Sequence, residues 1–500
     1  MGARTLPALP QYRKDGVTRR LCAAVHLDEQ FARWADRELT GDRLTSPGLT
    51  LGINFVALAR HARAAVVRRD TLDRQLTWLA AALGAALLTA GWGLAAGLGS
   101  VAVVGIYGPL AVLGASWWLI HRAESQARDA ARAVFLGTGK AEALAPPVRP
   151  EAEAWLHELK RANALPYADA AALTTPFVGS GTKIKEVVWQ PVDVSRPAEA
   201  PGGGTLPLRP FDAVDLHTYV AREMESIAGL AGLRARNRLY VIGSHAHLLP
   251  ELVPDRTARP RAQLPKQLVQ AGLLTPGAGM RTHLCLERVG EGGRVVVSMY
   301  LRAILHRPHL TWEVAAYVIP PLDGRFDRVD RLPVAPFDRW WSLVGYATSR
   351  LWPDLRGAPG RRRARRRRAR QDARALARRR REITDQHLLV DHGADGSVRA
   401  RLGDWAQAGY AERIDAQDYL FRLQQGVLVA TERFLKDHHV DTSSFDRARQ
   451  VISTQTYHIS GDITGPSNIG TGGQITVNGP PGPQGPGGPA AAQGQGGPTP

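Results

Sequence analysis

A run of 46 residues without a charged side chain, Gln75 to Ile120, limits the folds open to this chain. One helix of that length would measure about 69 Å, more than twice the roughly 30 Å hydrocarbon core of a bilayer. Two spans of about 20 residues fit that thickness, so we expect spans near 77–96 and 101–120, with a turn at Gly97–Ser100. The alternative is a buried hairpin in a soluble protein, but soluble cores seldom need so long a stretch without one charge.

Basic residues flank this run on both sides. Residues 55–74 carry five arginines, residues 121–140 carry three arginines and one lysine, and the turn carries no basic residue. By the positive-inside rule both flanks, and with them both termini, are expected in the cytoplasm. The predicted localisation is therefore the inner cell membrane, crossed twice. Two cysteines, Cys22 and Cys285, cannot form a disulfide framework, which agrees with a reducing compartment.

The composition of the two expected spans bears on their role. Neither contains Asp, Glu, Lys, Arg or His, which disfavours a carrier because transport paths usually require such groups. Trp78, Trp117 and Trp118 stand at the outer ends, where indole rings favour the headgroup zone. Gly93 and Gly97 form a GxxxG pair that could bring together the two helices or two copies of the chain. A homo-oligomer is thus one option, and an anchor whose helices pack on each other is the alternative.

A second feature is the concentration of arginine in residues 361–381. The chain carries 64 basic and 46 acidic residues, a net charge of +18, and this segment holds 13 Arg against one Asp. Its Arg and Ala residues favour a helix once the charge is neutralised; alone, self-repulsion keeps it extended. Anionic lipid is the first expected partner, nucleic acid the second, and a solvated linker the alternative to both. The candidate contacts are Arg361, Arg362, Arg363, Arg365, Arg366, Arg367, Arg368, Arg370, Arg378, Arg379, Arg380 and Arg381.

An aromatic helix is expected directly before this segment, from Phe337 to Trp352, because Pro353 should end it. Trp340, Leu343 or Val344, Ala347 and Leu351 recur at helical spacing. Such a stripe either packs on the preceding domain or lies in the membrane interface beside the arginines. The interfacial candidates are Trp340, Trp341 and Trp352.

Residues 171–336 are predicted to form an α/β domain. A helix at about 212–230, capped by Asp212, separates the first two of five strands. The last three strands form a meander, in which Leu305 pairs with Leu310 and Arg302 faces Glu313 across the strands, because that register matches both the apolar face and the charges. The expected strands are 184–192, 238–249, 282–289, 294–305 and 310–319.

No catalytic, cofactor or metal motif can be assigned in this domain. Residues 179–183 contain glycines, a lysine and a threonine, but not in P-loop order, and a strand follows where a helix is required. His245 and His247 are expected on one strand face and His283 and Cys285 on another, which could supply four zinc ligands, although the spacing matches no zinc pattern. We therefore predict no cofactor and no metal.

The predicted fold class is an α+β membrane protein. Residues 383–452 should hold a hairpin with an Asp-Gly turn at 391–396, then a helix capped by Asp415 with Leu420, Leu423, Val427 and Phe434 on one side, then a helix starting at Asp441. The expected segments are cytoplasmic helices at 1–74, the transmembrane hairpin at 75–121, juxtamembrane helices and linker at 122–170, the α/β domain at 171–336, the aromatic helix and Arg-rich segment at 337–382, the hairpin and helices at 383–452, short Gly/Ile-rich strands at 453–479 and a disordered Gly/Pro-rich tail at 480–500.

Two stretches carry a resemblance to known sequences: Thr175–Gly181 before a strand, and Gly461–Gly465 after a helix that holds Val440–Ser443. The chain resembles uncharacterised actinobacterial membrane proteins with a two-helix anchor and cytoplasmic domains. This resemblance implies no activity. The expected function is a non-enzymatic, membrane-anchored interaction, scaffold or sensor protein that faces the cytoplasm and binds an unidentified protein partner. The alternatives are a membrane-tethered nucleic-acid-binding protein and an enzyme whose site in 171–336 is assembled from distant residues.

Overall fold

Seven strands form one mixed sheet in the computed structural model, which describes residues 12–41, 43–96, 99–227 and 229–453. The strand order is β1-β4-β5-β6-β7-β2, and β3 also pairs with β7. β1 runs parallel to β4 and the remaining pairs are antiparallel. The strands are β1 (Ala164–Tyr167), β2 (Thr182–Val188), β3 (Val192–Asp193), β4 (Arg234–Ile242), β5 (Arg281–Val289), β6 (Val296–His306) and β7 (His309–Ile319).

The predicted meander is confirmed, including its register. Leu305 pairs with Leu310 and Arg302 pairs with Glu313, whose side chains form an ion pair at 3.2 Å. The strands extend one residue further than expected, to His306 and His309, because the loop between them has two residues and not four. The apolar face and one charge pair were therefore enough to predict the register of these two strands.

Two other strand predictions were wrong in their limits. The expected strand 184–192 divides into β2 and β3, and the expected strand 238–249 ends at Ile242, where a 3-10 helix, η3 (Gly243–Leu248), begins. The second strand ends where another segment packs closely against Gly243. A Cβ at this position would lie 1.8 Å from the Asp391 carboxylate, so only glycine leaves room for that contact. A distant segment, 391–393, therefore packs against the point where the strand stops. β1 was missed because it is short and contains Pro166.

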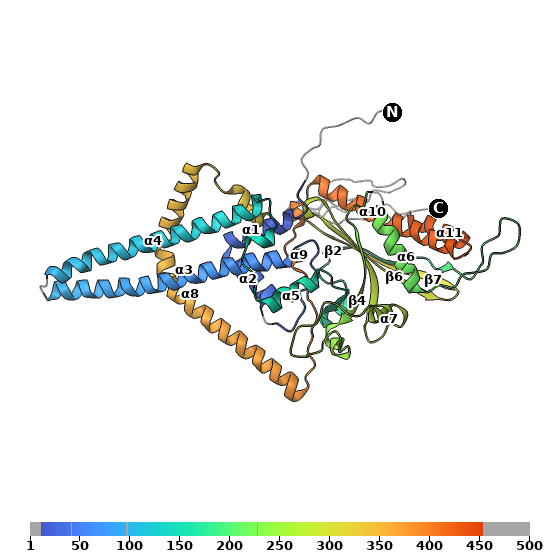
Figure 1. Ribbon diagram of the computed structural model, residues 1–500, viewed down its shortest axis with the longest axis horizontal. Helices are drawn as coiled ribbons and strands as arrows, with labels where there is room; N and C mark the ends of the chain where they lie inside the picture. The colour runs from blue at the N-terminus through green and yellow to red at the C-terminus, as the bar shows by residue number, and fades with distance from the viewer. Residues whose placement is uncertain (1–11, 42, 97–98, 228, 454–500) are drawn as a thin grey trace, which may run out of the picture. The chain divides into compact units, whose positions relative to one another are not determined.

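Helices cover both faces of the sheet (Figure 1). One face packs against α6 (Ala213–Ser226), α10 (Tyr410–Asp437) and α11 (Ser443–Ser453). The opposite face packs against α1 (Gly16–Leu27), α2 (Glu29–Thr40) and the start of α3 (Phe55–Ala95). Asp212 caps α6 as predicted, and Asp28 caps α2 by accepting from the Phe31 amide. The remaining helices are α4 (Gly99–Leu136), α5 (Pro150–Leu159), α7 (Lys266–Leu274), α8 (Pro336–Gln386), α9 (Val398–Arg401), η1 (Ala141–Leu144), η2 (Asp169–Leu173), η4 (Glu291–Gly293), η5 (Gly324–Arg331) and η6 (Trp405–Gln407).

The expected hairpin in 383–452 is wrong. Ser397 caps the short helix α9 by accepting from the Ala400 amide, and in place of a sheet Ala394 makes an isolated parallel bridge to Tyr167. The buried Arg399 side chain donates to the carbonyl oxygens of Gly293, Arg294 and Pro320, which favours the helical turn over a strand. α10 begins at Tyr410, before the expected cap at Asp415, and its four predicted core residues are buried.

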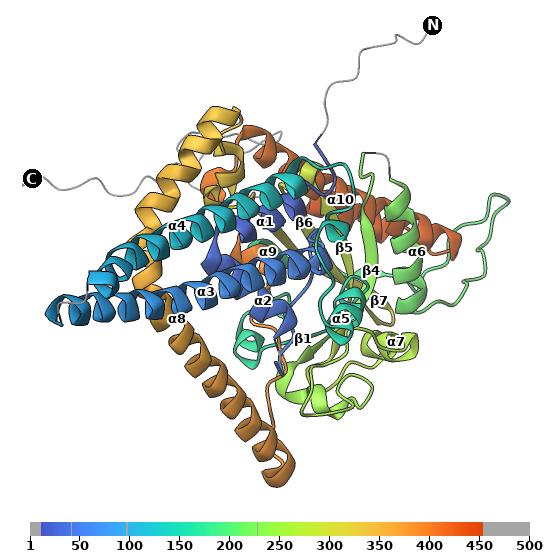
Figure 2. The same ribbon diagram turned by 60° about the vertical axis from the view of Figure 1, so that its left-hand side comes forward.

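Helices α3 and α4 carry the uncharged run and lie side by side (Figures 1 and 2). α3 ends at Ala95 and α4 begins at Gly99, so the connection overlaps the expected turn at Gly97–Ser100, but Gly99 and Ser100 already belong to α4. Among the described residues one helix, Phe55–Gly93 of α3, is long and apolar enough to cross a bilayer. α4 is not identified as a second membrane-spanning helix. The coarse prediction of a mixed α+β fold with an apolar helical segment is therefore confirmed.

The prediction that Pro353 ends the aromatic helix is wrong. α8 is 51 residues long, passes through Pro353 and Pro359 without ending, and includes the whole Arg-rich segment. Asp354, Leu355 and Ala358, which lie between the two prolines, are buried. Tertiary packing therefore outweighs the local cost of the prolines. The predicted strands at 453–479 and tail at 480–500 lie outside the described residues, apart from Ser453 at the end of α11.

Candidate membrane-surface site

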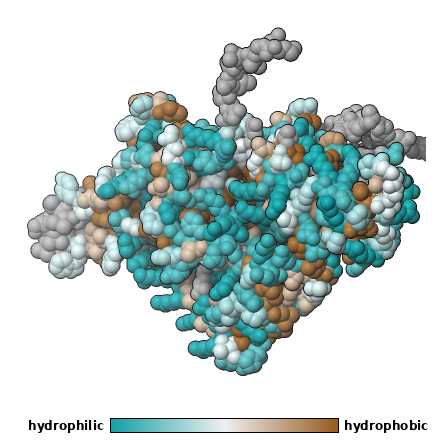
Figure 3. Space-filling model, turned by 45° about the vertical axis from the view of Figure 1, so that its right-hand side comes forward, coloured by the Kyte–Doolittle hydropathy of each residue, from teal (hydrophilic) through white to brown (hydrophobic). Residues whose placement is uncertain are grey.

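Large apolar side chains are exposed along α3 and α4. Their exposed fractions are 69% for Trp78, 77% for Leu88, 63% for Trp92, 67% for Tyr107 and 61% for Leu110. Figure 3 shows tan and brown residues beside the grey end of this hairpin, on a face that is otherwise largely teal. Large apolar side chains exposed together are typical of surfaces that contact lipid or another protein.

The two arms of the hairpin pack closely. A Cβ added to Gly105 of α4 would lie 2.4 Å from Ala90 of α3, so the glycine lets the two backbones approach. Gly84, Gly91 and Gly114 face open space. Of the predicted GxxxG pair, Gly93 is buried and Gly97 lies outside the described residues.

The first half of α8 crosses α3 and α4 about midway along their length (Figures 1 and 2). Ala347, Leu355 and Ala358 of α8 form one buried cluster with Leu72 and Leu76 of α3 and with Ile120 of α4. The Trp117 indole of α4 donates a hydrogen bond to the Thr348 hydroxyl of α8 at 3.1 Å. Trp117 is therefore half-buried against α8, whereas Trp78 and Trp118 are exposed.

Two fully buried carboxylates attach α8 to α3. Asp73 accepts hydrogen bonds from Arg361 (Nη2, 2.7 Å) and Arg365 (Nη1, 2.5 Å). Asp354 has Arg69 at 3.4 Å and Arg361 at 3.5 Å. Burial opposes ionisation of Asp73, but the two arginines outweigh it and lower the pKa of this carboxyl. Arg361 and Arg365 thus serve first as internal ion-pair partners, a role that the sequence did not indicate.

Ten of the 13 arginines in residues 361–381 lie on one of two faces of α8, and Arg362, Arg368 and Arg379 are in neither set. At 100° per residue, Arg361, Arg365, Leu376, Arg380 and Ile383 share one face. That face is directed at the protein: Leu376 and Ile383 pack with Leu44 and Val390, and the Arg380 Nε donates to the Thr257 carbonyl oxygen at 3.1 Å. The predicted surface contacts Arg361, Arg365 and Arg380 therefore make internal contacts.

The opposite face carries a row of exposed arginines, which we call the arginine stripe. Its spacing of three and four residues sets it along one side of the helix. From Arg363 to Arg381 it extends over about 27 Å. Arg374 was missing from the sequence-based candidates, although the same periodicity could have found it. The stripe consists of Arg363, Arg366, Arg367, Arg370, Arg374, Arg378 and Arg381.

The first half of α8 also has an exposed aromatic face. Phe337, Trp340, Trp341 and Trp352 are exposed, and the rings of Trp340 and Trp341 stack with centroids 5.4 Å apart. Leu343 and Ala347, from the same predicted stripe, are buried. The helix thus packs its aliphatic side inward and leaves its indoles outside.

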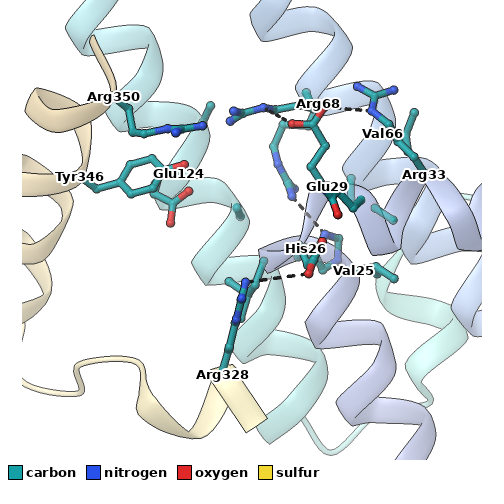
Figure 4. Close-up of a pocket in the computed structure, with 18 of the residues that line it drawn as sticks. Val25, His26, Glu29, Arg33, Val66, Arg68, Glu124, Arg328, Tyr346 and Arg350 are labelled. Atoms are coloured by element: carbon teal, nitrogen blue, oxygen red, sulfur yellow. Dashed lines mark hydrogen bonds and ion pairs between the residues drawn. The ribbon is translucent and has the colours of Figure 1, made fainter. Parts of the chain in front are cut away.

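A cavity of about 630 Å³ opens where α1, α2, α3, α4, α8 and η5 meet. Figure 4 shows Tyr346, Glu124 and Arg350 on one side, Arg68, His26 and Glu29 on the other, and Arg328 below. We call it the Arg68 cavity. Its lining includes six arginines and three carboxylates. The sequence did not reveal this site, because its residues come from segments more than 300 positions apart.

A chain of buried hydrogen bonds runs from this cavity into the protein. A guanidinium can only donate, so Arg68 Nη2 donates to His26 Nδ1 at 3.1 Å. His26 Nε2 then donates to His61 Nδ1 at 2.9 Å, and His61 Nε2 donates to the Ala141 carbonyl oxygen. Burial lowers the pKa of both histidines, more strongly for His26, where Arg68 and His61 add to the effect. Both rings are therefore neutral at pH 7.

The α/β domain has a smaller cavity of about 350 Å³. Phe177, Arg281, His283, Tyr300 and Glu313 are among its lining residues. Burial lowers the pKa of His283 to about 3 and raises that of Tyr300. The side chains of His283 and Tyr300 are buried and thus withdrawn from solvent.

The other sequence candidates do not meet in one site. His245 and His247 lie in η3 and not on a strand, and within the described ranges the structure has no group of three or more His, Cys, Asp or Glu arranged to hold a metal ion. The glycine loop at 179–183 packs against α9, because a Cβ on Gly179 would lie 2.3 Å from the Ser397 amide nitrogen. Its backbone is therefore occupied by the protein itself.

The fold and these surfaces define a mixed α+β protein with an apolar helical hairpin and a cationic helix. The AbeC-like domain family model matches residues 188–474, which is 287 of the 500 residues. The chain belongs to this family. The matched region contains β3 to β7, α8 with its arginine stripe, and α10 and α11, whereas α3 and α4 precede it. No curated protein and no solved structure matches the chain.

Proposed function

We propose that this protein is a membrane-anchored interaction, scaffold or sensor protein that faces the cytoplasm and docks the arginine stripe on anionic lipid. In this proposal α3 and α4 both cross the inner membrane, and both termini remain in the cytoplasm. The observation that carries it is the hairpin of exposed Trp, Leu and Tyr side chains, which water would solvate poorly.

The dimensions of the hairpin support insertion. The uncharged helical part is 21 residues long in α3, from Gln75 to Ala95, and 22 residues long in α4, from Gly99 to Ile120. Each is more than about 30 Å of helix, enough for a bilayer core of that thickness. In α3 the packing cluster with α8 ends at Leu83. The part of α3 beyond this cluster, the 12 residues after Leu83 up to Ala95, extends about 18 Å, which is less than the roughly 30 Å core.

The thickness of α8 can account for the rest of the membrane depth that the free part of α3 does not cover. A helix is about 10 Å thick, so α8 lying in the membrane interface brings the depth of the assembly close to 30 Å. Its exposed Trp340, Trp341 and Trp352 are side chains that favour this zone. The aromatic half of α8 then lies at the headgroups and the arginine stripe follows on the same helix.

The stripe fits an anionic surface because its arginines lie along one line. Each basic residue near an anionic membrane contributes about 1 kcal/mol, so a few engaged side chains hold the helix there. Arg378 has one carboxylate, Glu382, at 3.7 Å, a distance too long for strong neutralisation.

Membrane topology is tested by cysteine labelling in intact cells. Cys22 and Cys285 are fully buried, so an introduced thiol reports its own position. Ala96→Cys, at the end of α3, should react with an impermeant maleimide from outside, and Thr384→Cys, at the end of α8, only after lysis. Recovery of the chain in the soluble fraction, or outside labelling of Thr384→Cys, would refute the proposal.

Docking of the stripe is tested in nanodiscs with limited trypsin digestion. Phosphatidylglycerol should protect residues 361–381 compared with phosphatidylcholine alone, and the triple variant Arg366→Gln, Arg367→Gln, Arg370→Gln should lose that protection. Salt should weaken it, since exposed charges are screened within about 8 Å at physiological ionic strength. Equal cleavage in the two lipids would refute lipid docking.

A membrane-tethered nucleic-acid-binding protein is the second candidate, because the same stripe could follow a phosphate backbone. The exposed aromatics lie in the other half of α8 and are not interleaved with the stripe, which disfavours base stacking along it. This candidate would be favoured if the unchanged protein retained duplex DNA and the triple variant did not, and if phosphatidylglycerol gave residues 361–381 no protection against trypsin. The third candidate, an enzyme, would use the 350 Å³ cavity, whose His283 and Tyr300 are buried.

A further inference from the structure

The Arg68 cavity has an excess of positive charge that its own carboxylates do not neutralise. Glu29 is bonded to Arg33 and Arg69 at 2.9 and 3.0 Å, which occupies both of its oxygens. Glu124 is bonded at 2.7 Å to Arg128, which is outside the cavity lining.

Three arginines from three different elements remain. Arg68 of α3 is half-buried, and in the described part of the chain no carboxylate lies within 4 Å of it; its hydrogen bond goes to the neutral His26. Arg328 of η5 is 3.9 Å from Asp28, and Arg350 of α8 is 3.4 Å from Asp354. Strong charge-assisted hydrogen bonds measure about 2.7–2.9 Å, so these two contacts are loose.

The environment of Arg68 favours an added anion. Burial lowers the pKa of this guanidinium and the neighbouring Arg69 adds repulsion, while Glu124 acts on it only from beyond ion-pair distance. A desolvated cation without a close counterion is costly. The histidine bound to Arg68 donates its proton to His61, so it offers no negative charge.

We propose that the Arg68 cavity is a binding site for a phosphate group, held by Arg68 with Arg350 and Arg328. Guanidinium groups match phosphate oxygens in charge and in bidentate geometry. A volume of about 630 Å³ lies within the range of small-molecule sites, which leaves room for more than the phosphate itself. Two sources of the phosphate are considered. One is a lipid headgroup, since α3 and α4 run from the cavity into the uncharged part of the hairpin, and the other is a soluble phosphorylated compound.

This inference is independent of membrane insertion, because its first test needs no bilayer. The purified full-length chain in detergent should bind inorganic phosphate in equilibrium dialysis at constant ionic strength, with a saturable component of one phosphate per chain. Arg68→Gln should weaken that component about tenfold or more, as expected for loss of a charged hydrogen-bonding partner. Arg350→Gln, on the 45% exposed side chain, is a second variant that spares the buried part of the site.

The control is Arg433→Gln on α10, a 63% exposed arginine that is also paired with one carboxylate, at 3.1 Å. It should bind phosphate like the unchanged protein. If Arg68→Gln, Arg350→Gln and Arg433→Gln all behave alike, or if the unchanged chain shows no saturable binding of phosphate and no stabilisation by phosphatidylglycerol, the proposal is wrong.

The two sources of phosphate are separated in nanodiscs by the melting temperature. A rise caused by inorganic phosphate in discs of phosphatidylcholine alone, absent in Arg68→Gln, indicates a soluble phosphorylated ligand. A rise caused by phosphatidylglycerol without added phosphate, again absent in Arg68→Gln, indicates a lipid headgroup. A rise that Arg68→Gln retains in full comes from elsewhere, such as the arginine stripe, and would contradict the proposal.

Discussion

Asp73 is the residue on which attachment of α8 to the hairpin is expected to depend. Its side chain is fully buried and accepts from Arg361 and Arg365, so Asp73→Asn removes the negative charge between two arginines. The substitution keeps the size of the side chain, so the effect reports on charge and not on packing.

The expected magnitude follows from the exposure of the partners. Breaking a fully buried pair costs about 3–5 kcal/mol. Here the arginine side chains are 30% and 23% exposed, and Arg361 keeps a hydrogen bond to the Asp354 carbonyl oxygen at 3.2 Å. Water and this remaining bond recover part of the loss, so we expect about 2 kcal/mol, or roughly a 30-fold change in the local opening equilibrium.

The assay is amide hydrogen exchange of the full chain in nanodiscs. Peptides that cover residues 355–370 should exchange about 30 times faster in Asp73→Asn, while those of the sheet strands remain unchanged. Asp372→Asn, the same substitution at an exposed position of α8, is the matched control. Unchanged exchange in Asp73→Asn, or equal acceleration in the control, would refute the view that buried ion pairs attach α8.

Three further predictions concern other parts of the molecule. Gly105→Val should destabilise the hairpin by about 1–3 kcal/mol in detergent unfolding, because its Cβ would lie 2.4 Å from Ala90. His217 is buried and neutral, with its pKa lowered to about 4. The unfolded chain takes up this proton first as pH falls below about 6.5, so the share of the stability that depends on His217 should fall by about 2 kcal/mol between pH 7 and 5, and His217→Gln should reduce the total pH dependence by that amount. A nitroxide on Trp341→Cys should relax faster with oxygen than with a nickel chelate in nanodiscs, as expected in the membrane interface.

Each of these predictions has a matched control. Gly114→Val, on the same helix but facing open space, should change stability by less than about 0.5 kcal/mol. His157→Gln, the same substitution at an exposed histidine, is the control for His217→Gln. A nitroxide on Tyr410→Cys, at a residue that is 82% exposed on α10, should respond more to the nickel chelate. If a control variant changed the measured quantity as much as the variant it is paired with, the corresponding argument would be wrong.

Periodic and local signals were sufficient for several elements. The β6–β7 register followed from alternation of Leu301, Ala303 and Leu305 and from one charge pair, and the predicted cap of α6 follows the preference of Asp for the N-cap. The pairing of α3 with α4 followed from the length of the uncharged run. In each case the residues that specify the structure are close in sequence.

Long-range contacts account for the errors. The strand at 238–249 stops at Gly243 because residues 391–393 pack there, and Ser397 starts a helix because Arg399 reaches carbonyl groups about a hundred residues away. α8 passes through two prolines because Asp354, Leu355 and Ala358 are buried against other helices. Local propensity is weaker than such packing, so sequence reasoning placed these boundaries wrongly.

The amino-acid order alone defines where the charge-free run, the arginines and the β6–β7 hairpin occur, since period and charge are local properties. Which arginines face outward, and which bind Asp73, depends on contacts between residues 288 and 292 positions apart. The Arg68 cavity likewise exists only once α3, η5 and α8 are assembled. The physical reason is that buried ion pairs and cavities form between segments whose proximity no local pattern encodes.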